Sequence, residues 1–280
     1  MLKDCIGIFQ KKIEHMGNER GNADALILDN YIPADGDYIV VKKDGSVVKC
    51  SIKMDKKAGR PVKDLSDGDS QYEDIVFYDY HSRLVSMDKP QDSKKVIHSN
   101  NYLSFWIKKE SLTNGKLNME GIDRYFDILS NPRVKYKNAK DSKMYDYIFP
   151  VVGEVNQEKL EQCRNWIKQH IFNMQDLGID TSGKNYLKVF FEDDRDLYIN
   201  EEKRYLMTKI YNKNDYNIDI DEQIYGLPND NLALNSKKPY MEHKTRKNVV
   251  PYLITPEEAA TQRKFFDYLM NEANRGYTNI

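Results

Sequence analysis

Hydrophobic residues recur every three or four positions in several segments of this chain, a spacing that is typical of amphipathic helices. In the first such segment, polar residues separate Leu2, Ile6, Phe9, Ile13 and Met16. The spacing predicts helices over residues 2–16, 118–129, 156–178, 200–210 and 255–273, and favours a helix over a strand for 72–87.

Polar residues at the segment ends indicate where these helices begin and stop. Asn118, Asn156 and Asn200 are placed to cap first turns, and Gly178 is placed to end the third helix. Thr255, followed by a proline and then by a glutamate three positions on, is a capping box and the clearest helix start in the chain.

Other segments have the composition of strands. Residues 37–41 and 47–54 predict a β-hairpin, because the Asp44–Gly45 pair between them suits a tight turn. Segments 25–32, 96–108 and 186–191 are also predicted strands, the second with a polar interruption. Residues 55–71 are polar and contain glycine and proline, which predicts a loop.

These elements predict an α+β fold of mixed helices and antiparallel sheets in two packed subdomains. Residues 133–147 are rich in lysine and tyrosine and have no clear period, so we expect the boundary there, between subdomains 1–140 and 141–280. Residues 277–280 resemble the beginning of a strand, from which we expect the domain to continue beyond residue 280.

Composition narrows the functional classes. The 280 residues include 43 Lys and Arg against 44 Asp and Glu, so nucleic-acid binding would need a local basic patch. The three cysteines are far apart, which argues against a zinc knuckle and favours a reducing cytosol. We expect a cytoplasmic protein, because no signal peptide and no long apolar run is evident.

The segment from Gly226 to Lys247 carries the most functional information. Its side chains could bind nucleic acid, because amides read base edges and cations neutralise phosphates; the candidates are Asn229, Asn231, Asn235, Lys237, Lys238, Lys244, Arg246 and Lys247. The alternative is an ordinary basic surface loop. Gly226, Pro228 and Pro239 constrain the backbone, which argues against a plain helix face.

A second group could also bind nucleic acid, because aromatic rings beside amides and cations suit a single strand or a flipped base. Its members are Asn100, Asn101, Trp106, Lys108 and Lys109. The alternative, which the alternating aromatic residues favour, is that the rings fill the core and the two asparagines make a turn.

Recognisable enzyme signatures are absent, including nucleotide-binding glycine loops and the common zinc-protease motif. The acidic run of Glu192, Asp193, Asp194 and Asp196 could hold a magnesium ion in a nuclease, although a solvated turn is favoured. Asp79 and His81 could bind a metal, but without a second such pair we expect them on a helix surface. We therefore expect no catalysis and no cofactor.

Several phrases of the chain resemble one known family, the large subunit of the subtype I-B CRISPR effector complex, Cascade. They are DNYIPADGDYI (29–39), FYDYHSRLVSMDKP (77–90), KKVIHSNNYLSFWIKKESL (94–112), GLPNDN (226–231), NSKKPYMEHKTRK (235–247) and VPYLITPEEA (250–259). The resemblance is spread over nearly the whole chain and includes no catalytic motif.

The resemblance implies a subunit at the 5′-handle end of the CRISPR RNA, which recognises the protospacer-adjacent motif in double-stranded DNA and helps open the duplex. Its implied partners are CRISPR RNA, the other Cascade subunits, target DNA and a separately recruited helicase-nuclease that makes the cut. Family members are longer and have a C-terminal helical part, so this chain resembles their N-terminal portion.

Carried onto this sequence, the resemblance assigns motif reading to Asn229, Asn231 and Asn235, and phosphate contact to the cations of 237–247. With its net charge of −1, the chain alone should bind DNA weakly. A second alternative is a purely structural subunit whose tyrosine-rich surface docks neighbouring proteins.

Overall fold

The computed structural model describes the chain except for residues 1, 56–59, 64–68, 230–252 and 278–280. The described residues combine helices with two sheets, which confirms the predicted α+β class. They divide into two compact units: residues 33–206 form one, and residues 1–32 together with 207–280 form the other. This division differs from the predicted boundary after residue 140.

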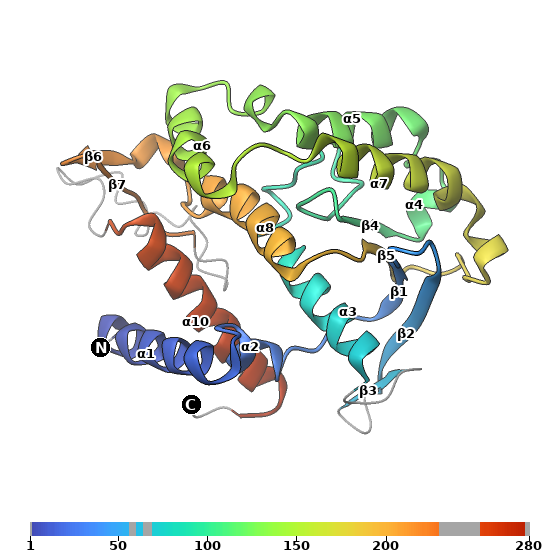
Figure 1. Cartoon of the computed structure of the whole chain (residues 1–280), viewed down its shortest axis with the longest axis horizontal. Helices are drawn as coiled ribbons and strands as arrows, with labels where there is room; N and C mark the ends of the chain where they lie inside the picture. Colours follow the sequence, from blue (N-terminus) through green and yellow to red (C-terminus); the bar gives the residue numbers. More distant parts are fainter. Residues whose placement is uncertain (1, 56–59, 64–68, 230–252, 278–280) are drawn as a thin grey trace. The chain divides into compact units, whose positions relative to one another are not determined.

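The larger unit is built on a five-stranded sheet in the order β3-β2-β1-β5-β4 (Figure 1). The strands are β1 (Gly36–Val41), β2 (Val47–Asp55), β3 (Arg60–Lys63), β4 (Ser104–Lys108) and β5 (Tyr186–Phe191). β1 and β2 form the predicted hairpin, whereas β5 runs parallel to β1 and antiparallel to β4. Residues 55–71 were predicted to be a loop, but they contain an edge strand, β3, which pairs with β2.

The position of β5 explains why the chain does not divide after residue 140. A strand from the second half of the sequence forms hydrogen bonds with two strands from the first half. The segment expected to be a boundary instead contains η1 (Pro132–Val134) and the beginning of α6 (Ala139–Val152). Asn138 starts α6, because its side chain accepts a hydrogen bond from the N–H of Asp141 at 2.8 Å.

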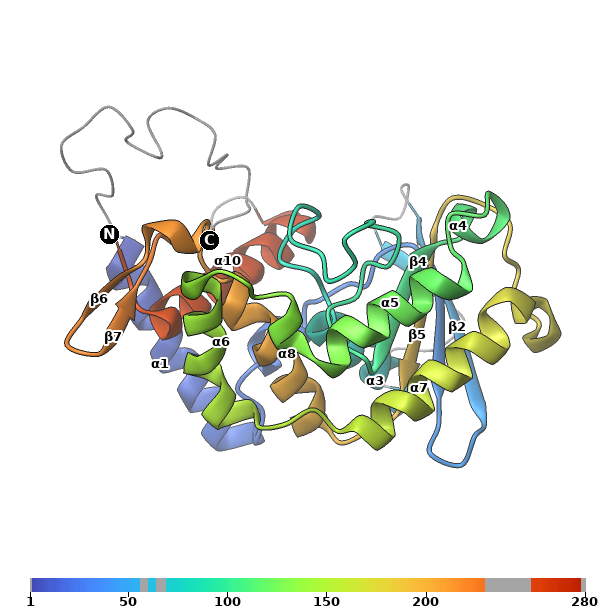
Figure 2. The ribbon, with the colours of Figure 1, turned by 90° about the horizontal axis from the view of Figure 1, so that it is seen from above.

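Helices cover both faces of this sheet (Figures 1 and 2). On one face, α5 (Met119–Ser130) places Phe126 parallel to Phe105 of β4, and α7 (Gln157–His170) places Trp166 edge-on to Phe191 of β5. On the other face, α3 (Ser70–His81) places Tyr78 against the sheet. The short helices α4 (Glu110–Thr113) and η2 (Ile171–Leu177) complete this unit with most of α8 (Arg195–Lys209).

The predicted caps of this unit are confirmed at two helices and wrong at a third. Asn118 and Asn156 accept hydrogen bonds from backbone N–H groups in the first turns of α5 and α7, and Gly178 ends η2 in the left-handed conformation. Asn200 is not a cap, because α8 begins five residues earlier at Arg195.

The smaller unit contains α1 (Leu2–Arg20), α2 (Ala25–Leu28), η3 (Asn214–Tyr216), the hairpin β6 (Ile218–Ile220) and β7 (Gln223–Tyr225), and α10 (Pro256–Asn274). Phe9 of α1 packs between Phe265 and Tyr268 of α10, with ring centres 5.4 and 5.6 Å away. Thr255 forms the predicted capping box with Glu258.

The strand predicted over residues 25–32 is wrong. The carbonyl oxygen of Asp24 accepts hydrogen bonds from the N–H groups of Ile27 and Leu28, which closes a helical turn. The Ile27 carbonyl oxygen in turn accepts a bond from the side chain of Asn271 in α10. Of the predicted terminal strand, only Tyr277 is described, and its N–H donates to the Glu272 carbonyl oxygen.

Candidate nucleic-acid interface

A β-bridge joins Gly226, the first residue of the predicted nucleic-acid segment, to Ile254, which follows the segment in the sequence. Gly226 and Ile254 exchange N–H to carbonyl hydrogen bonds of 3.0 Å in both directions, and the Tyr211 hydroxyl donates to the Ile254 carbonyl oxygen at 2.7 Å. A Cβ added at residue 226 would lie 2.5 Å from the Tyr211 ring. Glycine is therefore needed at this position so that the bridge can form.

Of the predicted reading and holding residues in this segment, only Asn229 is described. Its backbone N–H donates to the Ile210 carbonyl oxygen at 2.8 Å, and its buried side-chain Nδ2 has no hydrogen-bond partner among the described residues. The other predicted contacts lie outside the described residues and stay predictions: Asn231, Asn235, Lys237, Lys238, Lys244, Arg246 and Lys247.

The second predicted surface is not an exposed surface. Asn100 and Asn101 are each 1% exposed. The Asn100 side chain donates to the carbonyl oxygens of His81 and Arg83, and the Asn101 side-chain oxygen accepts from the Leu103 N–H. The two amides are used inside the protein to shape the turn before β4.

The other members of that group are also committed to the interior, with one exception. Trp106 is buried beneath the ammonium group of Lys188, which lies 3.8 Å from its ring centre. Lys109 is buried and pairs with Asp37, whereas Lys108 is exposed. Four of the five residues are thus buried in the protein interior, as the alternating aromatic pattern indicated.

The acidic run at the end of β5 is occupied by lysines of the same unit. Lys42 pairs with Glu192 at 2.9 Å, and Lys159 pairs with Asp193 at 2.7 Å. A hydrogen bond from the Lys43 N–H, together with the Lys42 ammonium, lowers the pKa of Glu192. Among the described residues, no group of three or more His, Cys, Asp or Glu side chains is arranged to hold a metal ion.

Asp79 and His81 are not on a helix surface, because each is only 1% exposed. Asp79 pairs with Lys188 of β5, and His81 Nδ1 is hydrogen-bonded to Glu202 of α8. The two side chains thus join α3 to different elements. The expectation that they were solvent-facing underestimated the burial of α3, which packs against both the sheet and α8.

A lysine-bearing loop, residues 90–98, is an exposed cationic site whose backbone is held by buried side chains. Asp92 organises the loop from beneath: one carboxylate oxygen accepts from the Lys94 N–H at 3.0 Å, and the other accepts from Val96 and Ile97 at 2.8 and 3.1 Å. Asp92 is 1% exposed. Three backbone groups are thereby held by one buried carboxylate.

Two further side chains fix the same loop. Lys135, which follows η1, donates to the carbonyl oxygens of Pro90 and Gln91. His98 closes the other end, because its Nε2 donates to the Lys95 carbonyl oxygen at 2.9 Å. Burial lowers the pKa of His98, which keeps its ring neutral near pH 7 and leaves Nδ1 to accept from the Tyr186 hydroxyl.

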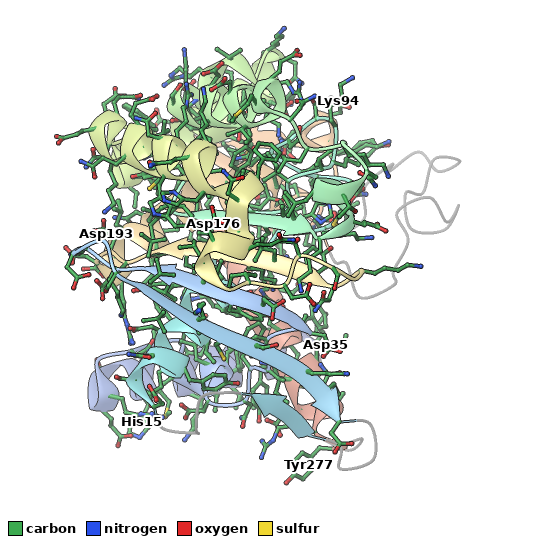
Figure 3. All side chains as sticks on the ribbon, turned by 90° about the vertical axis from the view of Figure 1, so that its right-hand side faces the viewer. His15, Asp35, Lys94, Asp176, Asp193 and Tyr277 are labelled. Atoms are coloured by element: carbon green, nitrogen blue, oxygen red, sulfur yellow. The ribbon has the colours of Figure 1, made fainter. Side chains whose placement is uncertain are left out.

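This fixed backbone presents Lys94 and Lys95 to solvent, with Lys95 in the left-handed conformation at φ 57°. Figure 3 shows Lys94 at the periphery, far from Asp193 of the acidic run. Lys137, two residues beyond Lys135, is also exposed. None of Lys94, Lys95 and Lys137 pairs with a carboxylate in the part of the chain that the structure describes.

The lysine-bearing loop was not predicted from the pattern of the sequence. Its signal there is only a Lys–Lys pair after Asp92, and such pairs are common on protein surfaces. What distinguishes this pair is the buried carboxylate beneath it, which only the tertiary structure reveals.

Comparison with models of protein families, with curated proteins and with solved structures found no match to this chain. None of the described helices is both long enough and apolar enough to cross a membrane.

Proposed function

We propose that this chain is the non-enzymatic large subunit of a subtype I-B CRISPR effector complex in antiviral defence. In this role it recognises the protospacer-adjacent motif in double-stranded DNA and helps to start R-loop formation. Support for the class comes from the family resemblance of the sequence phrases. Support for nucleic-acid contact comes from the lysine-bearing loop.

The observation that supports nucleic-acid contact is that the backbone of the lysine-bearing loop is fixed, while Lys94 and Lys95 have no carboxylate partner among the described residues. Asp92 and Lys135 hold the loop, so Lys94 and Lys95 can contact phosphates without ordering the backbone at the moment of binding. Their ammonium groups supply charge and register rather than base identity. Base reading is left to the asparagines at 229, 231 and 235.

A net charge of −1 fits a subunit that works within a ribonucleoprotein. Neighbouring subunits and CRISPR RNA would share the DNA, and a separately recruited helicase-nuclease would cut it. The lysine pairs at the acidic run favour this reading over a magnesium nuclease, because a metal ion would have to displace Lys42 and Lys159 from their carboxylates.

The test is DNA binding by the complex assembled with CRISPR RNA. The variant Lys94→Ala/Lys95→Ala should weaken binding to motif and non-motif duplexes alike, and should lower the slope of log K against log salt by about 0.9 for each lost phosphate contact. A charge-matched control is Lys116→Ala/Lys184→Ala, because both of these lysines are exposed on other loops.

Equal losses for the two double variants would show that the lysine-bearing loop makes no specific contact. The reading role is tested separately: Asn229→Ala or Asn231→Ala should erode preference for the correct motif by roughly 1–3 kcal/mol for each lost base contact. A loss that is the same on motif and non-motif DNA would refute base reading by these asparagines. DNA cleavage by the chain with magnesium would refute the non-enzymatic role.

A further inference from the structure

The β6–β7 hairpin of the smaller unit has an inner and an outer face. Cross-strand pairing places Asp219 opposite Ile224, and places Ile218 opposite Tyr225. Ile224 is 3% exposed, so its face is turned toward the protein. Because side chains alternate along a strand, Ile218, Ile220 and Tyr225 share the opposite, outer face with Gln223, the partner of Ile220.

Apart from Gln223, the outer face is apolar although it is open to solvent. Ile218 is 44% exposed and Ile220 is 50% exposed, and Tyr225 beside them is half-buried. A solvent-facing side of a hairpin ordinarily carries polar residues. Contiguous exposed apolar side chains with a polar rim are characteristic of protein interaction sites.

The rim of this face is acidic. Asp221 and Glu222 form the hairpin turn, and Asp215 precedes β6 by three residues. All three carboxylate side chains are exposed, and the stretch from residue 213 to 225 contains a single lysine. In Figures 1 and 2 the hairpin turn lies on the side away from α10.

The hairpin turn carries two of these acids at a conformational cost. Asp221 and Glu222 have φ angles of 49° and 65°, the left-handed region that both central residues of this turn type require. Asn–Gly would adopt that conformation with less strain. The sequence therefore keeps two charged residues at the tip of the hairpin although they strain its backbone.

We infer that the outer face of the β6–β7 hairpin binds a polypeptide segment of another protein in which apolar residues alternate with lysine or arginine. The isoleucines and the tyrosine supply the apolar contact, and the acidic rim supplies attraction and register for the cations. This inference is independent of the proposed function.

The same charges exclude other occupants. Nucleic acid would bring phosphates against the carboxylates of Asp215, Asp221 and Glu222, which repel it. A second copy of this chain would bring one acidic rim against another, and like charges opposed across strands are destabilising.

The experiment measures fluorescence anisotropy of labelled octapeptides with the full chain. The probes are an alternating Lys–Val peptide, a Glu–Val peptide and a Lys–Ser peptide, which separate charge from apolar contact. The Lys–Val peptide should bind saturably, and the other two roughly tenfold or more weakly. The variant Ile218→Thr/Ile220→Thr should lose affinity for Lys–Val by a similar factor, because threonine keeps the strand preference but removes apolar surface.

Two further variants separate binding from folding. Ile8→Thr, at a 71% exposed position of α1, should leave the affinity unchanged. Asp221→Asn/Glu222→Gly should leave the melting temperature unchanged or raise it, and should weaken binding of the Lys–Val peptide several-fold. The inference would be overturned if the Lys–Val peptide did not bind, or if the Lys–Val and Glu–Val peptides bound equally well. It would also be overturned if Ile8→Thr lost as much affinity as the hairpin variant, or if sedimentation showed dimers that depend on the hairpin.

Discussion

Replacing Asp79 by asparagine should destabilise the larger unit more than any comparable change at its surface. Lys188 projects from the middle of β5 with its Nζ 2.5 Å from Asp79 Oδ1, and the two residues are 3% and 1% exposed. The ring centres of Trp106 and Tyr38 lie 3.8 and 5.0 Å from the same nitrogen. The variant leaves this ammonium group buried without a counter-charge.

The expected loss follows from that burial. Breaking a buried ion pair on one side costs about 3–5 kcal/mol, because the remaining charge stays desolvated. The aromatic rings still attract the ammonium, by roughly 2 kcal/mol when it is desolvated, and asparagine keeps an acceptor oxygen. We therefore expect about 3 kcal/mol for Asp79→Asn, a large share of the roughly 5–15 kcal/mol that stabilises a typical protein.

The pH dependence gives a second signature. Burial lowers the pKa of Lys188 below its ordinary 10.5, against the opposing attraction of Asp79, and loss of the carboxylate lowers it further. Between the folded pKa and 10.5, the unfolded chain binds more protons than the folded chain, so stability rises with pH. The variant should therefore recover part of its lost stability as the pH rises toward 10.

Urea unfolding at pH 7 and at pH 9.5 measures both effects. The control is Asp123→Asn, which removes a partly exposed carboxylate 2.9 Å from Lys168 and should cost less than about 1 kcal/mol. A cost below about 1 kcal/mol for Asp79→Asn, or a cost that does not change with pH, would refute a buried, charged Lys188. The apolar double variant Asp79→Leu/Lys188→Met should recover most of the loss.

Three other substitutions test single features of the fold, each by thermal or urea unfolding. Gly226→Ala should lower the free energy of unfolding by roughly 1–3 kcal/mol, because the added Cβ would overlap the ring of Tyr211. The control Gly7→Ala has open space around it in α1 and should stabilise the protein by about 0.5–1 kcal/mol. Equal effects of the two substitutions would refute the overlap. Arg204→Met should cost about 3–5 kcal/mol, because it leaves the buried Glu201 carboxylate without its counter-charge and the carbonyl oxygens at the end of α6 without their donor. Adding Glu201→Gln should recover part of the lost stability. Thr255→Ala should cost about 1 kcal/mol by removing a helix cap, and no change would show that the cap is not needed.

Local chemistry made much of the secondary structure predictable. Asn118, Asn156 and Thr255 cap helices as expected, since a cap depends on a side chain and the backbone within the next three residues. The turn at Asp44 and Gly45 is likewise local, because it depends on the positive φ that Gly45 adopts. Segment 25–32 was mistaken for a strand because a short apolar run has no period that separates strand from helix.

The candidate sites were less predictable, because side-chain roles depend on burial. Asn100 and Trp106 have the chemistry of a nucleic-acid surface, yet packing turns both inward. Lys94 is outwardly unremarkable in the sequence and becomes a candidate only because a buried aspartate holds its backbone.

The sequence by itself determined the α+β class, most helix ends and the β1–β2 hairpin, since these depend on neighbouring residues. It also carries the family resemblance on which the proposed function rests. Only the tertiary structure decided that β5 lies between β1 and β4, and hence that the chain does not divide near residue 140. It also decided which charges are free for a partner, because neutralisation by Lys42, Lys159 and Lys188 involves residues far apart in the sequence.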